Sequence, residues 1–188
     1  MQRSNLPPAG HDARLDAAID WLSTVTAASG TSWAKIASAS EDASFRRYFR
    51  VHDQSGNSAI VMDAPPPQED VRPFVSVGQL LADGGIHVPQ LIAQDAARGF
   101  LLLGDLGCTT YLNALSACTD RERDAMFADA IAALVQLQQI NPIGAGATLP
   151  HYDAALLRRQ MHLFPHRDLG RHVRDDLSND EKNGLERV

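Results

Sequence analysis

The sequence predicts an α+β protein on the basis of three observations. From residue 33 to 106, short runs of alternating apolar and polar side chains are separated by turn residues, a pattern typical of strands. One helical pattern interrupts these runs, and after Gly107 only helical patterns follow. The length of 188 residues suffices for one ordinary domain, or for one small lobe and part of another.

The first element is an expected helix over 12 to 28. Apolar residues such as Leu15 and Leu22 recur there at helical spacing. Asp12 is available as the N-cap, and Gly30 provides an end signal. The sequence therefore predicts an amphipathic helix ahead of the strands.

The strand-rich part begins with an expected strand from Trp33 to Ser38. A β-hairpin follows, formed by FRRYFRV and SAIVMD around the turn DQSGN. The triple proline at 65 to 67 ends this run, and a short helix over RPFVSVGQLL comes next, with Phe74, Val77 and Leu81 facing inward. VPQLIAQD and GFLLLGDLG then predict two further strands around the turn DAARG. The count is five strands with one inserted helix.

The remainder of the sequence is helical in pattern. Thr119 and Glu122 form a capping box for a helix reaching Gln139. A further helix is expected after Asp153, and a second capping box at 178 to 181 opens a last one. The expected organisation is a disordered tail over 1-11, a strand-rich lobe over 12-106 and a partial helical lobe over 107-188.

Composition narrows the class of protein. A hydrophobic fraction of 44% and a charged fraction of 21% are typical of a soluble globular protein. The net charge of -6 argues against a nucleic-acid partner, because phosphate contacts favour a basic face. No apolar run is long enough for a signal peptide or a membrane span, so we expect a cytoplasmic protein with no membrane partner. Cys108 and Cys118 have no metal-ligand spacing and are expected to be reduced structural thiols.

The stretch HRDLGRHV, from His166 to Val173, resembles the catalytic loop H-R-D-L-x-x-x-N of kinases. In that motif the Asp accepts the proton of the attacking hydroxyl, and the Asn five residues on binds a magnesium ion. Here Val173 stands at the position of the Asn and cannot bind a metal. We interpret Asp168 as a chance match, and no catalytic or metal-binding residue is predicted in the chain.

Five segments carry a resemblance to a known family: SASEDASFRRYFRV, AIVMDAPP, HVPQLIAQD, GFLLLGDLGCTTYL and YDAALLRRQMHLFP. Together they span most of the chain from 12 to 165, and they resemble the aminoglycoside phosphotransferase and choline kinase superfamily. Within it they are most similar to the anomeric kinases of N-acetylmuramate and N-acetylglucosamine that recycle cell-wall sugars. The resemblance implies a protein-kinase-like N-terminal lobe followed by the first helices of an incomplete helical lobe. It also places HRDLGRHV upstream of the family's catalytic loop.

The resemblance implies that the hairpin containing Ser44, Phe45, Arg46 and Arg47 covers the nucleotide phosphates. Backbone N–H groups and cations near phosphate oxygens suit that task. The alternative from the residues alone is an exposed hairpin edge whose arginines keep it soluble.

Two more segments are implied as nucleotide contacts. Met62 and Asp63 stand where kinases place a Lys that pairs with a helix Glu, and the following helix contains no Glu. Asp63 could instead cap the end of its strand. Leu103, Asp105 and Leu106 belong to the hinge segment, Leu101 to Gly107, whose backbone would bind adenine. The alternative for the hinge is a core strand that ends in a turn.

The functional expectation is the N-terminal portion of an ATP-dependent amino-sugar kinase, inactive as this chain. The resemblance implies ATP and Mg²⁺ as cofactors, bound weakly or not at all here, and an amino-sugar substrate for the whole protein. The rival expectation is a kinase-like lobe that acts as a non-catalytic binding or regulatory module. The residues present are the same under both hypotheses, and they do not identify the sugar.

Overall fold

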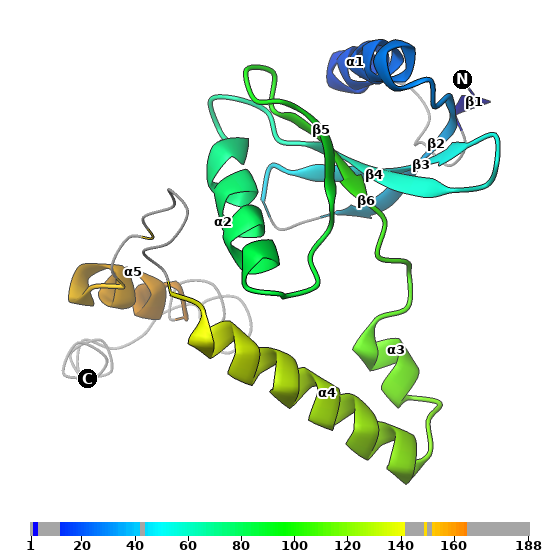
Figure 1. The fold of residues 1–188 in the computed structure, drawn as a ribbon. Coiled ribbons are helices and arrows are strands. Elements are labelled where there is room, and N and C mark those ends of the chain that lie inside the picture. The colour runs from blue at the N-terminus through cyan, green and yellow to red at the C-terminus, as the bar shows by residue number, and fades with distance from the viewer. Residues whose placement is uncertain (1, 4–11, 42–43, 142–148, 150–151, 165–188) are drawn as a thin grey trace, which may run out of the picture. The chain divides into compact units, whose positions relative to one another are not determined.

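The computed structural model describes residues 2–3, 12–41, 44–141, 149 and 152–164 (Figure 1). The chain divides into two compact units, 1–147 and 148–188. In the second unit the helix α5, Ala154–Phe164, begins directly after Asp153 as predicted. The predicted helix at 178 to 188 and the HRDLGRHV stretch lie outside the described residues.

The helix α1, Ala13–Ser29, confirms the first predicted helix. The Asp12 side chain accepts a hydrogen bond from the backbone N–H of Leu15 at 3.0 Å, which satisfies one of the orphan donors of the first turn. Gly30 ends the helix with φ of 74°, a left-handed conformation that favours glycine. Both ends are therefore set by local sequence.

One sheet holds six strands in the order β1-β2-β3-β4-β6-β5. The strands are β1 Gln2–Arg3, β2 Trp33–Glu41, β3 Arg47–Asp53, β4 Ser58–Asp63, β5 Leu91–Asp95 and β6 Phe100–Gly104. The five from β2 to β6 pair antiparallel, which confirms the predicted sheet. The two-residue β1 pairs parallel with β2 and was not predicted. The strand β2 also extends to Glu41, beyond the predicted end at Ser38.

The helices α1 and α2, Val71–Asp83, pack on opposite faces of the sheet (Figure 1). Because side chains alternate along a strand, each strand serves both faces. The α1 face contains the buried side chains of Leu15, Trp21, Leu22, Phe49, Val51, Val61, Phe100 and Leu102, among others. The α2 face contains Met62, Val71, Leu101 and Leu103, with Tyr48, Ile60, Phe74 and Val75 packed against them.

The inward face of α2 differs slightly from the predicted one. The buried residues of this helix are Val71 and Leu80. Phe74, Val77 and Leu81, which we expected to face inward, are half-buried. Phe74 packs against the α2-face cluster as expected, whereas the fully buried positions of the helix are Val71 and Leu80.

Two helices follow the sheet in the first unit. The short helix α3, Tyr111–Leu115, was not predicted. The helix α4, Asp120–Gln139, carries the predicted capping box: Thr119 and Glu122 exchange backbone and side-chain hydrogen bonds. Neither α3 nor α4 contains a buried residue.

Candidate functional site

The tip of the β2–β3 hairpin, residues 44–46, is the first predicted contact region. Ser44 and Phe45 are exposed, and the Phe45 side chain is 65% accessible. The backbone N–H of Arg46 donates to Ser44 Oγ at 3.2 Å, which folds the tip into a local turn. Backbone and side chains at this tip are therefore presented outward, in a position where a ligand could meet them.

Arg46 lies half-buried beside Glu69, and its Nε donates to Glu69 Oε2 at 3.0 Å. Burial works to lower the pKa of Arg46, but the carboxylate of Glu69 and the phenol of Tyr48 outweigh it and raise the pKa further. Glu69 directly precedes Asp70, the N-cap of α2. This ion pair thus connects the hairpin to the start of α2.

Arg47, the next residue, has a different environment. Its Nη2 donates to Asp63 Oδ2 at 2.6 Å, and its Nη1 donates to Asp12 Oδ2 at 2.6 Å. Asp63 is fully buried, and its other oxygen accepts from Arg14 Nε at 3.1 Å. The hydrogen bond from Arg47 lowers the pKa of Asp12. Two arginines and two aspartates therefore join α1, β3 and β4.

This arrangement gives Asp63 a structural role that sequence reasoning missed. Both carboxylate oxygens accept from arginines, as a buried charge requires. The Arg14 guanidinium also lies 4.4 Å from the ring centroid of Phe100, so it is packed as well as paired. The alternation of β3 was the available signal, since Arg47 shares a face with Phe49 and Val51.

Met62 occupies the opposite face of β4 from Asp63. Its side chain is fully buried and packs in the cluster that includes Leu101 and Leu103, with Phe74 of α2 against it. At this position β4 and α2 are joined by apolar packing in place of a Lys–Glu ion pair.

The hinge segment is braced by its aspartate. Asp105 accepts two hydrogen bonds from Arg50, at 2.6 Å from Nε and 2.9 Å from Nη2, and one from the backbone N–H of Gly107 at 2.9 Å. The hydrogen bond from Arg50 is the largest cause of a pKa for Asp105 well below its usual range. Leu103 is buried in the α2-face cluster, whereas Leu106 is 57% exposed. Arg50 is a further residue that sequence reasoning did not single out.

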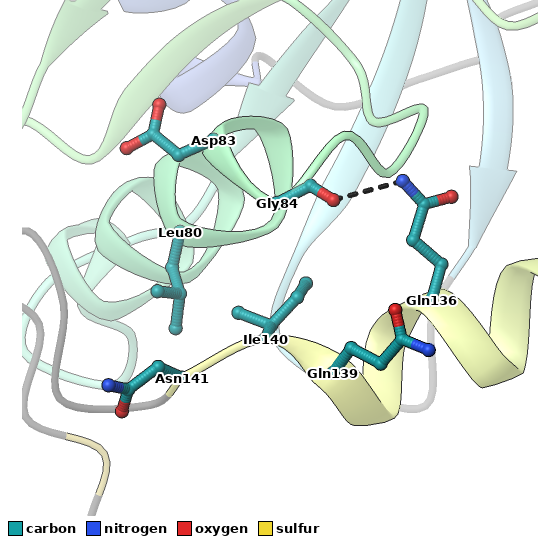
Figure 2. A pocket seen from close by; sticks show the side chains of 7 residues that line it. All are labelled: Leu80, Asp83, Gly84, Gln136, Gln139, Ile140 and Asn141. Atoms are coloured by element: carbon teal, nitrogen blue, oxygen red, sulfur yellow. Dashed lines mark hydrogen bonds between the residues drawn. The ribbon is translucent and has the colours of Figure 1, made fainter.

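A cavity of about 400 Å³ lies elsewhere in the first unit, between the C-terminal ends of α2 and α4. Figure 2 shows its lining residues: Leu80, Asp83, Gly84, Gln136, Gln139, Ile140 and Asn141. Gln136 Nε2 donates to the Gly84 carbonyl at 3.0 Å. A Cβ on Gly84 would meet the end of the Ile140 side chain, which would have to shift to make room for it. None of the predicted nucleotide contacts lines this cavity.

No group of three or more His, Cys, Asp or Glu side chains is placed to bind a metal ion within the described ranges. Among the same residues, no helix has both the length and the apolar content to cross a membrane.

A five-stranded antiparallel sheet with one helix inserted after its third strand, followed by a connector into helices, defines a kinase-like N-terminal lobe of the α+β class. The model of the phosphotransferase enzyme family matches residues 35–183. The chain belongs to this family.

Three relatives share the name N-acetylmuramate/N-acetylglucosamine kinase. The protein from Pseudomonas putida is 45% identical over 185 residues, which cover 95% of this chain and 52% of the relative. The protein from Pseudomonas aeruginosa is 51% identical, covering 77% of this chain and 40% of the relative. The protein from Neisseria meningitidis is 39% identical, covering 72% and 40%. The chain thus spans about half, or less, of the length of these relatives.

Proposed function

We propose that this chain is the nucleotide-binding lobe, with the first helices of the second lobe, of an ATP-dependent amino-sugar kinase. The supporting observation is the hairpin tip and the hinge segment at opposite ends of the same sheet, in a chain of the phosphotransferase enzyme family. The names of the relatives support an amino sugar as the acceptor. An ATP-dependent enzyme works where ATP is present, so the cytoplasm is the proposed location.

The proposed nucleotide pose follows the α2 face of the sheet. Adenine would bind the backbone of the hinge segment near Leu103 and Leu106, where the chain leaves the sheet at the end of β6. The phosphates would extend toward the hairpin tip at Ser44 and Phe45. The register supports this direction, because Ala59 pairs with Gly104 at the hinge end of β4, and Asp63 pairs with Arg47 at the hairpin end.

The remaining predicted contacts would act by holding the site in shape. Asp105 would brace the hinge through Arg50, and Asp63 and Arg47 would fix the hairpin against α1. Met62 would support the floor of the site from the core. Each of these side chains has an intramolecular partner or is buried, which favours positioning over direct contact.

The reaction of such a kinase forms a bond between a sugar hydroxyl oxygen and the γ-phosphorus and breaks the bond to the bridging oxygen of ADP. An Asp takes the hydroxyl proton, and metal ions and cations neutralise the transferring charge. We assign neither that Asp nor a metal ligand to this chain. The 188-residue chain is therefore proposed to bind nucleotide weakly and to transfer no phosphate by itself.

Two measurements test this proposal together. In an NMR titration with ATP, we expect shift changes confined to 44–47 and 103–107, and no changes around the cavity near Gly84. In a radiolabel assay, we expect no phosphorylation of N-acetylmuramate above a protein-free control. Robust phosphorylation would overturn the proposed inactivity. Absence of any nucleotide-dependent shift would overturn the nucleotide site and favour a non-catalytic module.

A further inference from the structure

The adjacent arginines of the hairpin serve opposite faces of the sheet. Arg47 points to the α1 face, where Asp63 and Asp12 bind it. Arg46 contacts Glu69 and Tyr48, and Tyr48 packs in the α2-face cluster. This divergence follows from strand alternation, which sends neighbouring side chains to opposite sides. Of the two, only Arg46 lies on the face where the nucleotide is proposed to bind.

A second arginine on this face, Arg50, is paired at the opposite end of the sheet. Arg50 contacts both oxygens of Asp105 and the carbonyl of Gly107, at the hinge end of the sheet. The strand position that would carry a kinase lysine holds the buried Met62. Among the described strand and hairpin residues of the α2 face, Arg46 is therefore the cation at the hairpin end, where the phosphates would lie. Arg72, on α2 itself, is paired with Asp70 and is 78% exposed.

The following proposal rests on the proposed function. We propose that Glu69 binds the guanidinium of Arg46 in the nucleotide-free protein, at the position that the phosphates of the nucleotide take when it binds. Nucleotide binding would exchange the carboxylate of Glu69 for phosphate oxygens on the same guanidinium. The Arg46–Glu69 pair would then take the role of the kinase Lys–Glu pair, with its two residues on different elements of the fold. Its cation comes from the hairpin, and its acid comes from the residue before the N-cap of α2.

The physical basis is competition between two anions for one guanidinium. Arg binds carboxylate and phosphate through the same fork of N–H donors, so the two ligands exclude each other in part. The pair is accessible enough for exchange, since the side chains of Arg46 and Glu69 are 33% and 12% exposed. The contact is a hydrogen bond from Arg46 Nε to a singly charged carboxylate, and a multiply charged phosphate group can compete with it for the guanidinium.

The test is a set of NMR titrations on the 188-residue chain with ATP and with adenosine. EDTA is present, so that only the protein's own cations meet the phosphates. Arg46→Gln is expected to weaken ATP binding about tenfold and to leave adenosine binding unchanged. Arg46→Lys keeps the charge but loses the forked N–H donors of arginine. Its affinity for ATP should therefore lie between those of the unmodified chain and Arg46→Gln. Glu69→Gln is expected to strengthen ATP binding about threefold, again without effect on adenosine.

A matched control is Arg72→Gln, which removes an arginine that is 78% exposed and paired with Asp70 beside the same helix start. It should change the affinity for neither ATP nor adenosine.

If Glu69→Gln weakens ATP binding or leaves it unchanged, the proposed exchange of Glu69 for phosphate on Arg46 is wrong, even though the nucleotide site stands. Equal loss of ATP and adenosine binding in Arg46→Gln would mean structural damage and would also overturn the proposal. If the unmodified chain binds neither ligand, the proposed function itself fails.

Discussion

Two regions of the first unit differ in the burial of their apolar residues. One is the sheet with α1 and α2, and the other is the pair of helices α3 and α4 that follow it. Every buried apolar side chain among the described residues falls between Leu15 and Leu103. In α4, by contrast, Phe127, Ile131 and Leu134 are 50%, 60% and 52% exposed. A helix can thus be specified by its caps and yet contribute no core of its own. Caps are local hydrogen bonds, whereas burial needs a partner surface.

The largest expected contrast between these regions comes from one substitution made in each. Leu102→Ala removes a fully buried side chain from β6 and should cost about 3 kcal/mol of unfolding free energy. Leu134→Ala in α4 should cost about 0.5 kcal/mol or less, because its side chain is already half in solvent. Urea denaturation of both variants measures the difference. Equal losses would mean that α4 has a buried partner in solution.

A smaller effect is expected from the buried charge that ties the sheet to α1. Asp63→Asn leaves Arg14 and Arg47 without their shared carboxylate and should cost about 2 kcal/mol. The cost is kept below that of a fully buried pair because the arginines are 34% and 37% exposed. Asp129→Asn on the exposed surface of α4 is the control, with a loss under about 0.5 kcal/mol. A loss for Asp63→Asn as small as the control's would contradict the structural role of this residue.

The smallest effect is a pH dependence at the hinge. Because the folded pKa of Asp105 is depressed below its ordinary value of 3.8, its contribution to stability is present above that value. It is lost as the pH falls from there toward the folded pKa. The chain should therefore lose stability between pH 7 and pH 3, and Asp105→Asn should lose less over the same interval. Urea midpoints at the two pH values measure the slopes, and parallel slopes would count against the Arg50–Asp105 brace.

Much of the fold was predictable because its signals are local. The turn DQSGN, the N-cap Asp12 and the capping box at Thr119 act over a few residues, and the structure confirms all three. The helix α3 was missed because its five residues are too few to show a helical period. The strand β1 was missed because two residues of pairing leave no alternation to detect.

The candidate site was predictable in its segments but not in its roles. The sequence pointed to the hairpin arginines, to Met62 and Asp63, and to the hinge. It did not show that Asp63 accepts hydrogen bonds from two arginines, or that Arg46 and Arg47 form ion pairs with different carboxylates. Their nucleotide contacts remain predictions. Arg46 and the outward-facing residues of the tip and hinge are the ones that we propose for direct contact.

The sequence by itself determined where α1, β4 and α4 begin and end, because caps, turns and side-chain periodicity depend on neighbours along the chain. Only the tertiary structure decided which acid each arginine binds. Asp63, Glu69 and Asp105 lie 16, 23 and 55 residues from Arg47, Arg46 and Arg50. Sheet register sets the first pairing, and the approach of the α2 start and the hinge segment to the sheet sets the other two. It also decided that the apolar face of α4 lies open while that of α1 is buried, since burial depends on what packs against a helix and not on its own pattern.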